Sequence, residues 1–179
     1  MSMINLGILI LRLVLGLTFM GHGSQKLFGW FGGHGLPGTT AMMQKMRLRV
    51  PGFWAWVVAL SEFGGGLLLV LGFLNPLGPL VIIAVMLVAI IQVHLPKGFW
   101  NTQGGIEFPM LNLFAALALA MVGPGAYSLD SVLALYLPEP VILLVGLALV
   151  LIGVAYEQSS LARQPVAGSP TGQGEQKSG

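Results

Sequence analysis

The sequence has 179 residues, of which 55% are hydrophobic and only 8% are charged. An ordinary soluble domain has about 25% charged residues, so this composition excludes a soluble globular protein and favours a helical integral membrane protein. The net charge of +2 is too small to follow a phosphate backbone, which excludes a nucleic-acid-binding protein. The absence of cysteine excludes disulfides, thiolate metal sites and iron–sulfur ligation by this chain.

Five apolar segments predict membrane-spanning helices, because a helix needs about 20 residues to cross a hydrocarbon core of about 30 Å. Together they predict one transmembrane helical bundle over residues 1–156, and they cover residues 4–23, 53–73, 77–95, 106–123 and 138–156. The first segment lacks the basic start and the cleavage site of a secretion signal, so we expect it to be retained. The last two segments are close to the minimum length, which leaves the count at four or five spans.

The segments between and after these spans are of three kinds. Residues 29–38 are too rich in glycine for regular structure. Met42, Met43 and Met46 alternate with basic residues over 39–49, a pattern typical of a short helix lying on the membrane surface. Residues 157–179 offer almost nothing to bury and are predicted to be a disordered cytoplasmic tail.

The basic residues of the loops and tail predict the orientation of the chain in the membrane. If there are five spans, all of these residues fall on the side opposite to the N-terminus: Lys26, Lys45, Arg47, Arg49, Lys97, Arg163 and Lys177. Since cytoplasmic loops collect Lys and Arg, we expect the N-terminus outside and the C-terminus in the cytoplasm. With four spans the tail would change sides, but the two basic loops would remain cytoplasmic.

Two ionisable residues lie deep inside predicted spans, where each charge costs about 2.5 to 3.5 kcal/mol. Counting the helical rise from each span's start places Arg12 about 12 Å and Glu62 about 16 Å from the same surface. The matching depths predict an Arg12–Glu62 ion pair, which either fixes the helix register or takes part in chemistry. Ser61 and Gly65 beside it indicate close helix packing, or room for a planar ligand next to Glu62.

A second polar cluster is predicted at the cytoplasmic ends of three spans. Its members are His22, Gln25, Lys26, His94 and Glu107. Their spacing is unlike a compact metal motif, so no metal site is predicted. The cluster instead indicates a site for a polar ligand, such as a quinone head group, with Glu62 deeper in the membrane. The alternative is that these are ordinary polar residues at helix ends.

Several segments, in this order, resemble the DoxX family. They are RLVLG at 12–16, HGSQKLFGWFGG at 22–33, EFGGGLLL at 62–69, GF at 98–99, GIE at 105–107 and GPGAYSLD at 123–130. The resemblance implies a bundle of four membrane helices in a bacterial plasma (inner) membrane, to which the segment at 138–156 adds a fifth. It also marks signature positions, which are Arg12, His22, Gln25, Lys26, Glu62, Glu107 and Asp130.

The resemblance implies a membrane oxidoreductase component acting on quinone or reduced sulfur compounds. Family members include a subunit of a thiosulfate:quinone oxidoreductase, a mycobacterial membrane component that works with soluble redox and sulfur-transfer enzymes, and proteins linked to quinone or catechol resistance. The chain has no cysteine, flavin fingerprint or haem-attachment motif, so electrons would pass through quinone or a partner. Two alternatives stay open: a non-catalytic anchor or assembly subunit, with oligomers possible, and a small transporter of hydrophobic compounds.

Overall fold

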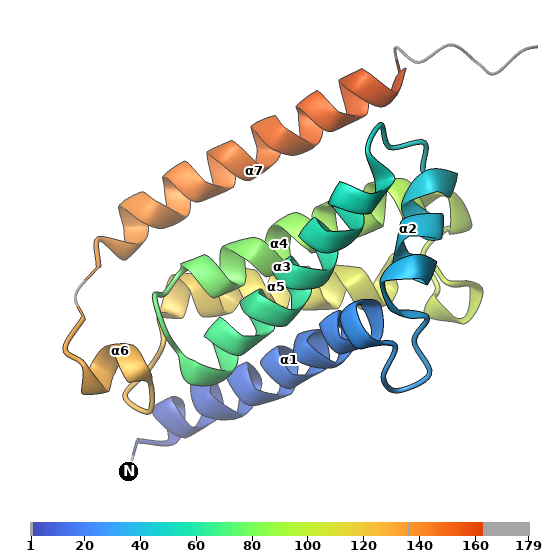
Figure 1. Ribbon diagram of the computed structural model, residues 1–179. Coiled ribbons are helices and arrows are strands. Elements are labelled where there is room, and N and C mark those ends of the chain that lie inside the picture. Colours follow the sequence, from blue (N-terminus) through green and yellow to red (C-terminus); the bar gives the residue numbers. More distant parts are fainter. Residues whose placement is uncertain (1, 136, 163–179) are drawn as a thin grey trace, which may run out of the picture.

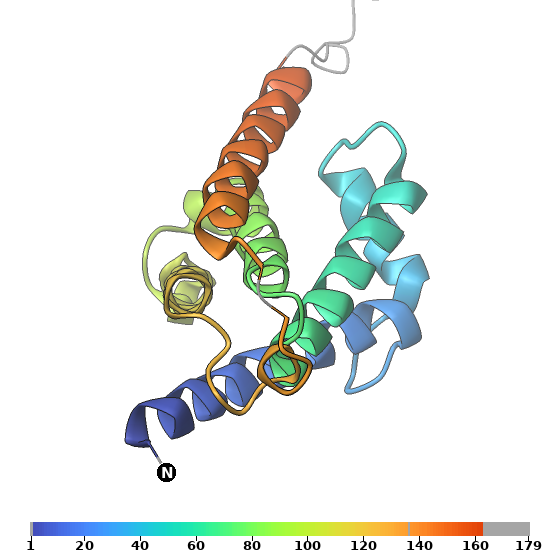
Figure 2. The ribbon, with the colours of Figure 1, turned by 90° about the vertical axis from the view of Figure 1, so that its left-hand side faces the viewer.

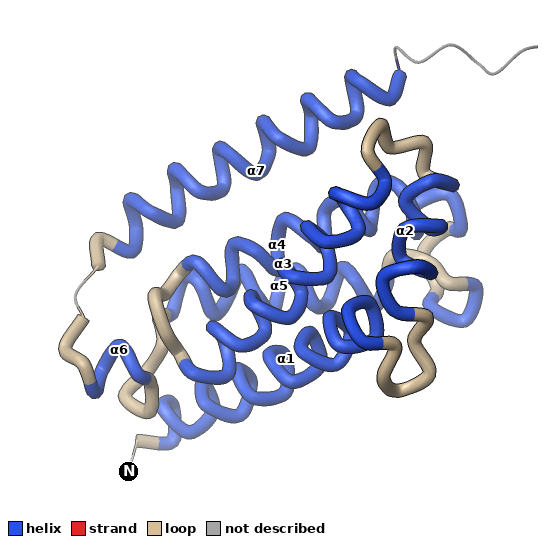
Figure 3. Tube along the Cα trace, viewed as in Figure 1, coloured by secondary structure: helices blue, strands red, loops and turns tan. Residues whose placement is uncertain are grey.

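The computed structural model describes residues 2–135 and 137–162, and all regular structure in them is helical (Figures 1 and 3). The helices are α1 (Met3–Phe28), α2 (Gly35–Lys45), α3 (Pro51–Leu71), α4 (Leu77–Ala89), α5 (Glu107–Val122), α6 (Leu129–Val132) and α7 (Glu139–Ala162). One π-helical turn, η1 (Ile90–His94), and one 3-10 turn, η2 (Leu95–Lys97), prolong α4, and η3 (Asn101–Gln103) lies in the next loop. The predicted all-α fold is confirmed.

Four of these helices are long and apolar enough to cross a membrane. They are Met3–Phe28, Pro51–Leu71, Leu77–Lys97 and Glu139–Ser159. α5 is apolar but has only 16 residues, about 24 Å of helix, so it is shorter than the span predicted there. The C-terminal apolar segment does form a long helix, α7.

Two predicted boundaries need correction. α7 continues to Ala162, so residues 157–162 are helical where a disordered tail was expected; they contain no glycine or proline to stop the helix. The rest of that predicted tail, 163–179, lies outside the described residues. The predicted surface helix at 39–49 is instead α2, Gly35–Lys45, so residues 35–38, which were expected to lack regular structure, form its first turn. The helix stops before Arg47, which adopts a left-handed backbone with φ of 60°.

The long helices run alternately up and down, which gives the bundle two distinct ends (Figure 1). We call them the α2 end, where α1 finishes and α3 begins, and the α6 end, where α3 finishes and α4 and α7 begin. Gly29, with φ of 74°, ends α1 and turns the chain toward α2, which packs against α1 and α3. All the loops with Lys or Arg in the described residues lie at the α2 end.

Glycine contacts bring α1 and α3 into backbone contact. A Cβ on Gly16 would lie 2.7 Å from the carbonyl oxygen of Gly66, and a Cβ on Gly66 would lie 2.6 Å from that of Gly16. Small residues favour this close approach in membranes because no hydrophobic effect drives apolar helices together there. These contacts fix the register of α1 against α3.

Similar contacts join the other helices. Gly65 of α3 meets Val81 and Ile82 of α4, and Gly78 of α4 meets the backbone of α3 at Leu69. The buried core that results lies between α1, α3, α4 and α5, and includes Leu15, Phe19, Leu69, Ile82, Ile83, Ala116 and Leu119. α7 packs mainly against α4 and lies at the margin of the bundle (Figure 2).

Candidate functional site

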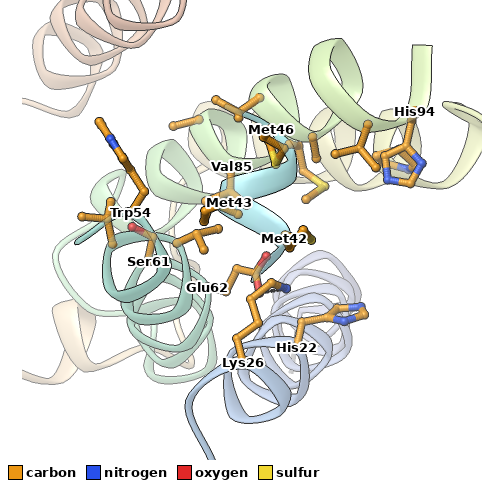
Figure 4. A pocket seen from close by; sticks show the side chains of 18 of the residues that line it. His22, Lys26, Met42, Met43, Met46, Trp54, Ser61, Glu62, Val85 and His94 are labelled. Carbon is orange, nitrogen blue, oxygen red and sulfur yellow. Dashed lines mark hydrogen bonds and ion pairs between the residues drawn. The ribbon is translucent and has the colours of Figure 1, made fainter. Parts of the chain in front are cut away.

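A cavity of about 450 Å³ lies in the half of the bundle nearest the α2 end (Figure 4). Helices α1 to α5 all contribute side chains to it, and α7 contributes Glu157. Most of the lining is apolar, with a few polar side chains. This combination of apolar walls and few polar groups is typical of sites for small organic molecules.

Helix α2 covers one side of the cavity. Met42, Met43 and Met46 line it, together with Leu48 from the turn that follows. Met43 and Leu48 are buried and pack against Ala55 of α3. The methionine pattern that predicts a surface helix therefore also supplies an adaptable apolar wall, because the unbranched thioether side chain fills irregular spaces.

An ion pair between Lys26 of α1 and Glu62 of α3 lies on the cavity wall. The ammonium Nζ donates a hydrogen bond to Glu62 Oε2 at 2.6 Å, with 22% of the Lys26 side chain and 6% of the Glu62 side chain exposed. Glu62 uses one of the three ammonium donors, so Lys26 can still donate to a ligand. The pairing also keeps the carboxylate from being a lone charge in an apolar site.

His22 and His94 also line the cavity, and each has its ring fixed by a hydrogen bond at Nδ1. His22 Nδ1 donates to Gln25 Oε1 at 3.2 Å, and His94 Nδ1 donates to the carbonyl oxygen of Gly104 at 2.7 Å. Since both partners are oxygen atoms that only accept, the proton of each neutral ring lies on Nδ1. Nε2 of each ring is then an acceptor that can take a hydrogen bond or a proton.

Two other predicted site residues do not line the cavity. Gln25 holds His22 and donates from Nε2 to the carbonyl oxygen of Phe31, so it orients the imidazole. Glu107 accepts a hydrogen bond from the backbone N–H of Asn101 at 2.9 Å and shapes the loop before α5. The cluster expected from the sequence is therefore divided, with His22, Lys26, Glu62 and His94 at the cavity.

The predicted Arg12–Glu62 ion pair is wrong. Arg12 is buried at the α6 end, where its guanidinium donates to the carbonyl oxygens of Leu69 at 2.9 Å, Tyr127 at 3.0 Å and Val70 at 3.2 Å, and to that of Pro124. The depth estimate failed because the contact of Gly16 with Gly66 places Arg12 beside the last turn of α3, about two turns beyond Glu62.

Asp130, a signature position of the resemblance, completes this structure at the α6 end. Its carboxylate accepts hydrogen bonds from the backbone N–H groups of Leu74 and Asn75 at 2.8 and 2.9 Å, and its own N–H donates to the carbonyl of Gly72. Asp130 and Arg12 thus tie the loop after α5 to the end of α3. Their contacts are to the backbone, which indicates a structural role.

Two side chains at the cavity, Asn112 and Trp54, were not predicted from the sequence, whereas Ser61 was predicted as a packing residue or a neighbour of a ligand. Asn112 is a polar side chain in the apolar helix α5, and that contrast was a usable signal. Trp54 of α3 also lines the cavity, and tryptophan near a membrane surface gives no signal of a site because it is common there. Within the described ranges, no group of three or more His, Asp or Glu side chains is arranged to hold a metal ion.

Comparison with known proteins places this arrangement in a family. The DoxX family model matches residues 7–95, a range that contains Arg12, His22, Lys26, Glu62 and His94. The inner membrane protein YqjF of Escherichia coli (strain K12) is 34% identical over an alignment of 132 residues that covers 72% of this chain and 93% of YqjF. The chain belongs to the DoxX family.

Two further relatives of this DoxX-family protein agree with that assignment. The Bacillus subtilis (strain 168) protein named "Putative oxidoreductase CatD" is 31% identical, over 70% of this chain and 86% of CatD. The Escherichia coli inner membrane protein YphA is 32% identical, over 69% of this chain and 87% of YphA. No solved structure matches the chain. With its long apolar helices, this DoxX-family chain is a multi-pass protein of the bacterial inner membrane.

Proposed function

We propose that this protein is a quinone-linked membrane oxidoreductase component that holds the quinone head group in the cavity at the α2 end. One observation carries the proposal. The Lys26–Glu62 ion pair, whose carboxylate is buried, and two imidazoles line one mainly apolar cavity in the half of the bundle nearest the α2 end. The name of CatD includes the word oxidoreductase, which supports a redox role at the level of the family.

The residues at the cavity fit a quinone head group. Its ring needs apolar walls, which Phe19 and the methionines of α2 offer, and its oxygens need hydrogen-bond partners. Lys26 can donate to a carbonyl oxygen, and Nε2 of His22 or His94 can accept from a hydroxyl. A bound quinone supplies two-electron, two-proton redox chemistry, which this chain's own side chains lack.

The protons of that chemistry would be handled by His22, His94 and the Lys26–Glu62 pair. A neutral imidazole with Nδ1 already donating can take a proton at Nε2, and it becomes a donor once it is charged. Lys26 holds the neighbouring carboxylate in place and balances its charge. Electrons would come from a soluble redox or sulfur-transfer enzyme that oxidises a reduced sulfur compound.

The α2 end is proposed to face the cytoplasm. The segments that join the long helices there contain Lys45, Arg47, Arg49 and Lys97, whereas those at the α6 end contain Asp130, are followed by Glu139 at the start of α7, and have no Lys or Arg. The N-terminus would then lie outside, and the soluble partner would dock on the cytoplasmic face. The hydrogen-bonded closure of the α6 end by Arg12 and Asp130 favours a binding site open to one side over a transporter.

Quinone binding to the purified protein in lipid nanodiscs tests the proposal. Menadione should bind the unmodified protein, and Glu62→Gln or Lys26→Met should weaken binding at least tenfold because the head group loses an oriented charged partner. Glu107→Gln is the matched control, since that carboxylate lies at the same end but does not line the cavity.

Equal loss of binding in all three variants, or no binding by the unmodified protein, would contradict the proposal. Lipid extracts of the protein purified in mild detergent provide a second measurement. An oxidoreductase component should carry quinone, whereas a non-catalytic anchor should carry stoichiometric soluble protein without it.

A further inference from the structure

The cavity has two unlike sides. In Figure 4, His22 and His94 lie on one side of Glu62, and Trp54 and Ser61 lie on the other. Beyond Ser61, the second side has apolar lining from two helices. Trp54, Val57 and Ser61 follow one face of α3, and Ala84 and Val88 follow one face of α4. We call the space between these five residues the tail arm.

The packing of α3 and α4 closes the tail arm toward the α6 end. The two helices touch at Gly65, which meets the side chains of Val81 and Ile82, and at Gly78, which meets Leu68 Cβ and the backbone of Gly65 and Leu69. Val81 contacts Gly65, and Ala84 and Val88 follow it at helical spacing on the same face of α4. The two helices therefore form the two side walls of the arm along its length.

Helix α2 covers the cavity toward the α2 end. Met42, Met43 and Met46 line the cavity there, and Met43 is packed against α3. Val57, Ser61, Ala84 and Val88 are each partly exposed, so the tail arm is open sideways between α3 and α4. Trp54, at that margin, is 37% exposed. In a membrane, a sideways opening between two spanning helices faces lipid chains.

We infer that the ligand is a lipid-soluble molecule with a hydrocarbon chain, that it enters sideways from the bilayer, and that its chain stays in the tail arm. This rests on the proposed function and adds the class of quinone: one with a chain, in place of a small water-soluble quinone, catechol or anion. The polar side of the cavity holds the ring, and the arm guides the chain from the ring to the lipid.

Photolabelling of the unmodified protein tests where the chain lies. A naphthoquinone with a diazirine on the first carbons of its alkyl chain is bound in nanodiscs, irradiated, and mapped by mass spectrometry. Labels should fall on Trp54 and Val57 of α3 and on Val88 of α4. Labels on the loop at 98–106 or only on α2 would overturn the inference.

A blocking variant tests the same point by affinity. Val88→Phe places a ring in the arm, so it should weaken binding of the chain-bearing naphthoquinone at least tenfold and change menadione binding less than twofold. Leu144→Phe on the lipid-facing surface of α7, where Leu144 is 69% exposed, is the control and should change neither. For each ligand, the affinity of the variant is compared with that of the unmodified protein. The partitioning of the ligand into the lipid is the same in both measurements and does not affect their ratio.

These results separate the inference from the proposed function. If menadione binds but Val88→Phe leaves the affinity for the chain-bearing compound unchanged, the chain does not lie in the tail arm, and the proposed head-group site stands. If neither compound binds, both proposals fail. If Val88→Phe weakens both compounds equally, the arm is not specific for the chain and the inference is overturned.

Discussion

Arg12 and Lys26 are both basic residues of α1, but they meet different partners. Arg12 donates to four backbone carbonyl oxygens, whereas Lys26 donates to the carboxylate of Glu62. The planar guanidinium suits the first arrangement because its donors point in several fixed directions. The compact ammonium suits the second. Depth in the membrane predicts the wrong partner for Glu62, because it ignores the register of α1 against α3 that the contact of Gly16 with Gly66 sets.

Two double-mutant cycles should distinguish these partners. For Lys26→Met and Glu62→Gln, the destabilisation by the double change should be smaller than the sum of the single changes, because each single change leaves a partly or fully buried partner unpaired, at about 3 kcal/mol. For Arg12→Leu and Glu62→Gln, the changes should add within about 0.5 kcal/mol, because the residues share no contact. Thermal unfolding in detergent measures both cycles.

A coupling energy above about 0.5 kcal/mol between Arg12 and Glu62 would contradict the structure. Additive losses of stability for Lys26→Met and Glu62→Gln would contradict it as well. Lys45→Met is a control for the loss of an exposed lysine at the same end.

Arg12 itself should be sensitive to a conservative change. Arg12→Lys retains the charge but has fewer donors in a different geometry, so two or more carbonyl groups would lose their partners, each at about 1 to 3 kcal/mol. We therefore expect Arg12→Lys to lower the melting temperature nearly as much as Arg12→Leu, measured in the same detergent. Full recovery of stability by Arg12→Lys would show that charge alone is required.

At the scale of the elements, glycines decide how closely the helices approach. Gly66 touches the backbone of α1, whereas Gly64, two residues earlier on α3, has open space where a Cβ would be. The glycine run at 64–66 predicts close packing, but its members cannot be told apart from sequence, because the choice depends on which face of α3 meets α1.

Gly66→Val should destabilise the protein by about 3 kcal/mol or more, since its side chain would collide with the backbone near Gly16 and Met20. Gly64→Val on the same helix should cost less than about 1 kcal/mol, because the new side chain meets nothing. Thermal unfolding of the two variants in one detergent measures the difference. Similar losses in both would mean that helix propensity, and not the contact with α1, sets the cost.

At the scale of the whole molecule, charge in the loops predicts how the bundle sits in the membrane. Fluorescent-protein fusions after residue 179 and within residues 37–40 should both be bright, and alkaline phosphatase fusions at the same places should both be inactive, because both places would be cytoplasmic. A phosphatase-active fusion at the C-terminus would mean that α7, or the short helix α5, does not cross the membrane.

The composition and the long apolar segments alone determined that the chain is a helical membrane protein. Hydrocarbon has no hydrogen-bond partners for the backbone, and a continuous apolar segment of about 20 residues satisfies its own backbone groups there as a helix. The same reasoning selected His22, Gln25, Lys26, His94 and Glu107 as a group near one membrane face, with Glu62 deeper in the membrane. Such conclusions depend on length and residue type, which are local properties of a sequence.

Only the tertiary structure decided which of these residues meet. Whether Glu62 pairs with Arg12 or with Lys26 depends on a shift of α3 along α1, and that shift is set by backbone contacts at Gly16 and Gly66. The separation of Glu107 from the cavity depends on the loop before α5. The helical rise gives the depth of a residue only if the start of each span is known, and an error of two turns in that start shifts the depth by about 11 Å. A hydrogen bond forms over about 3 Å, so depth alone cannot determine which side chains are in contact.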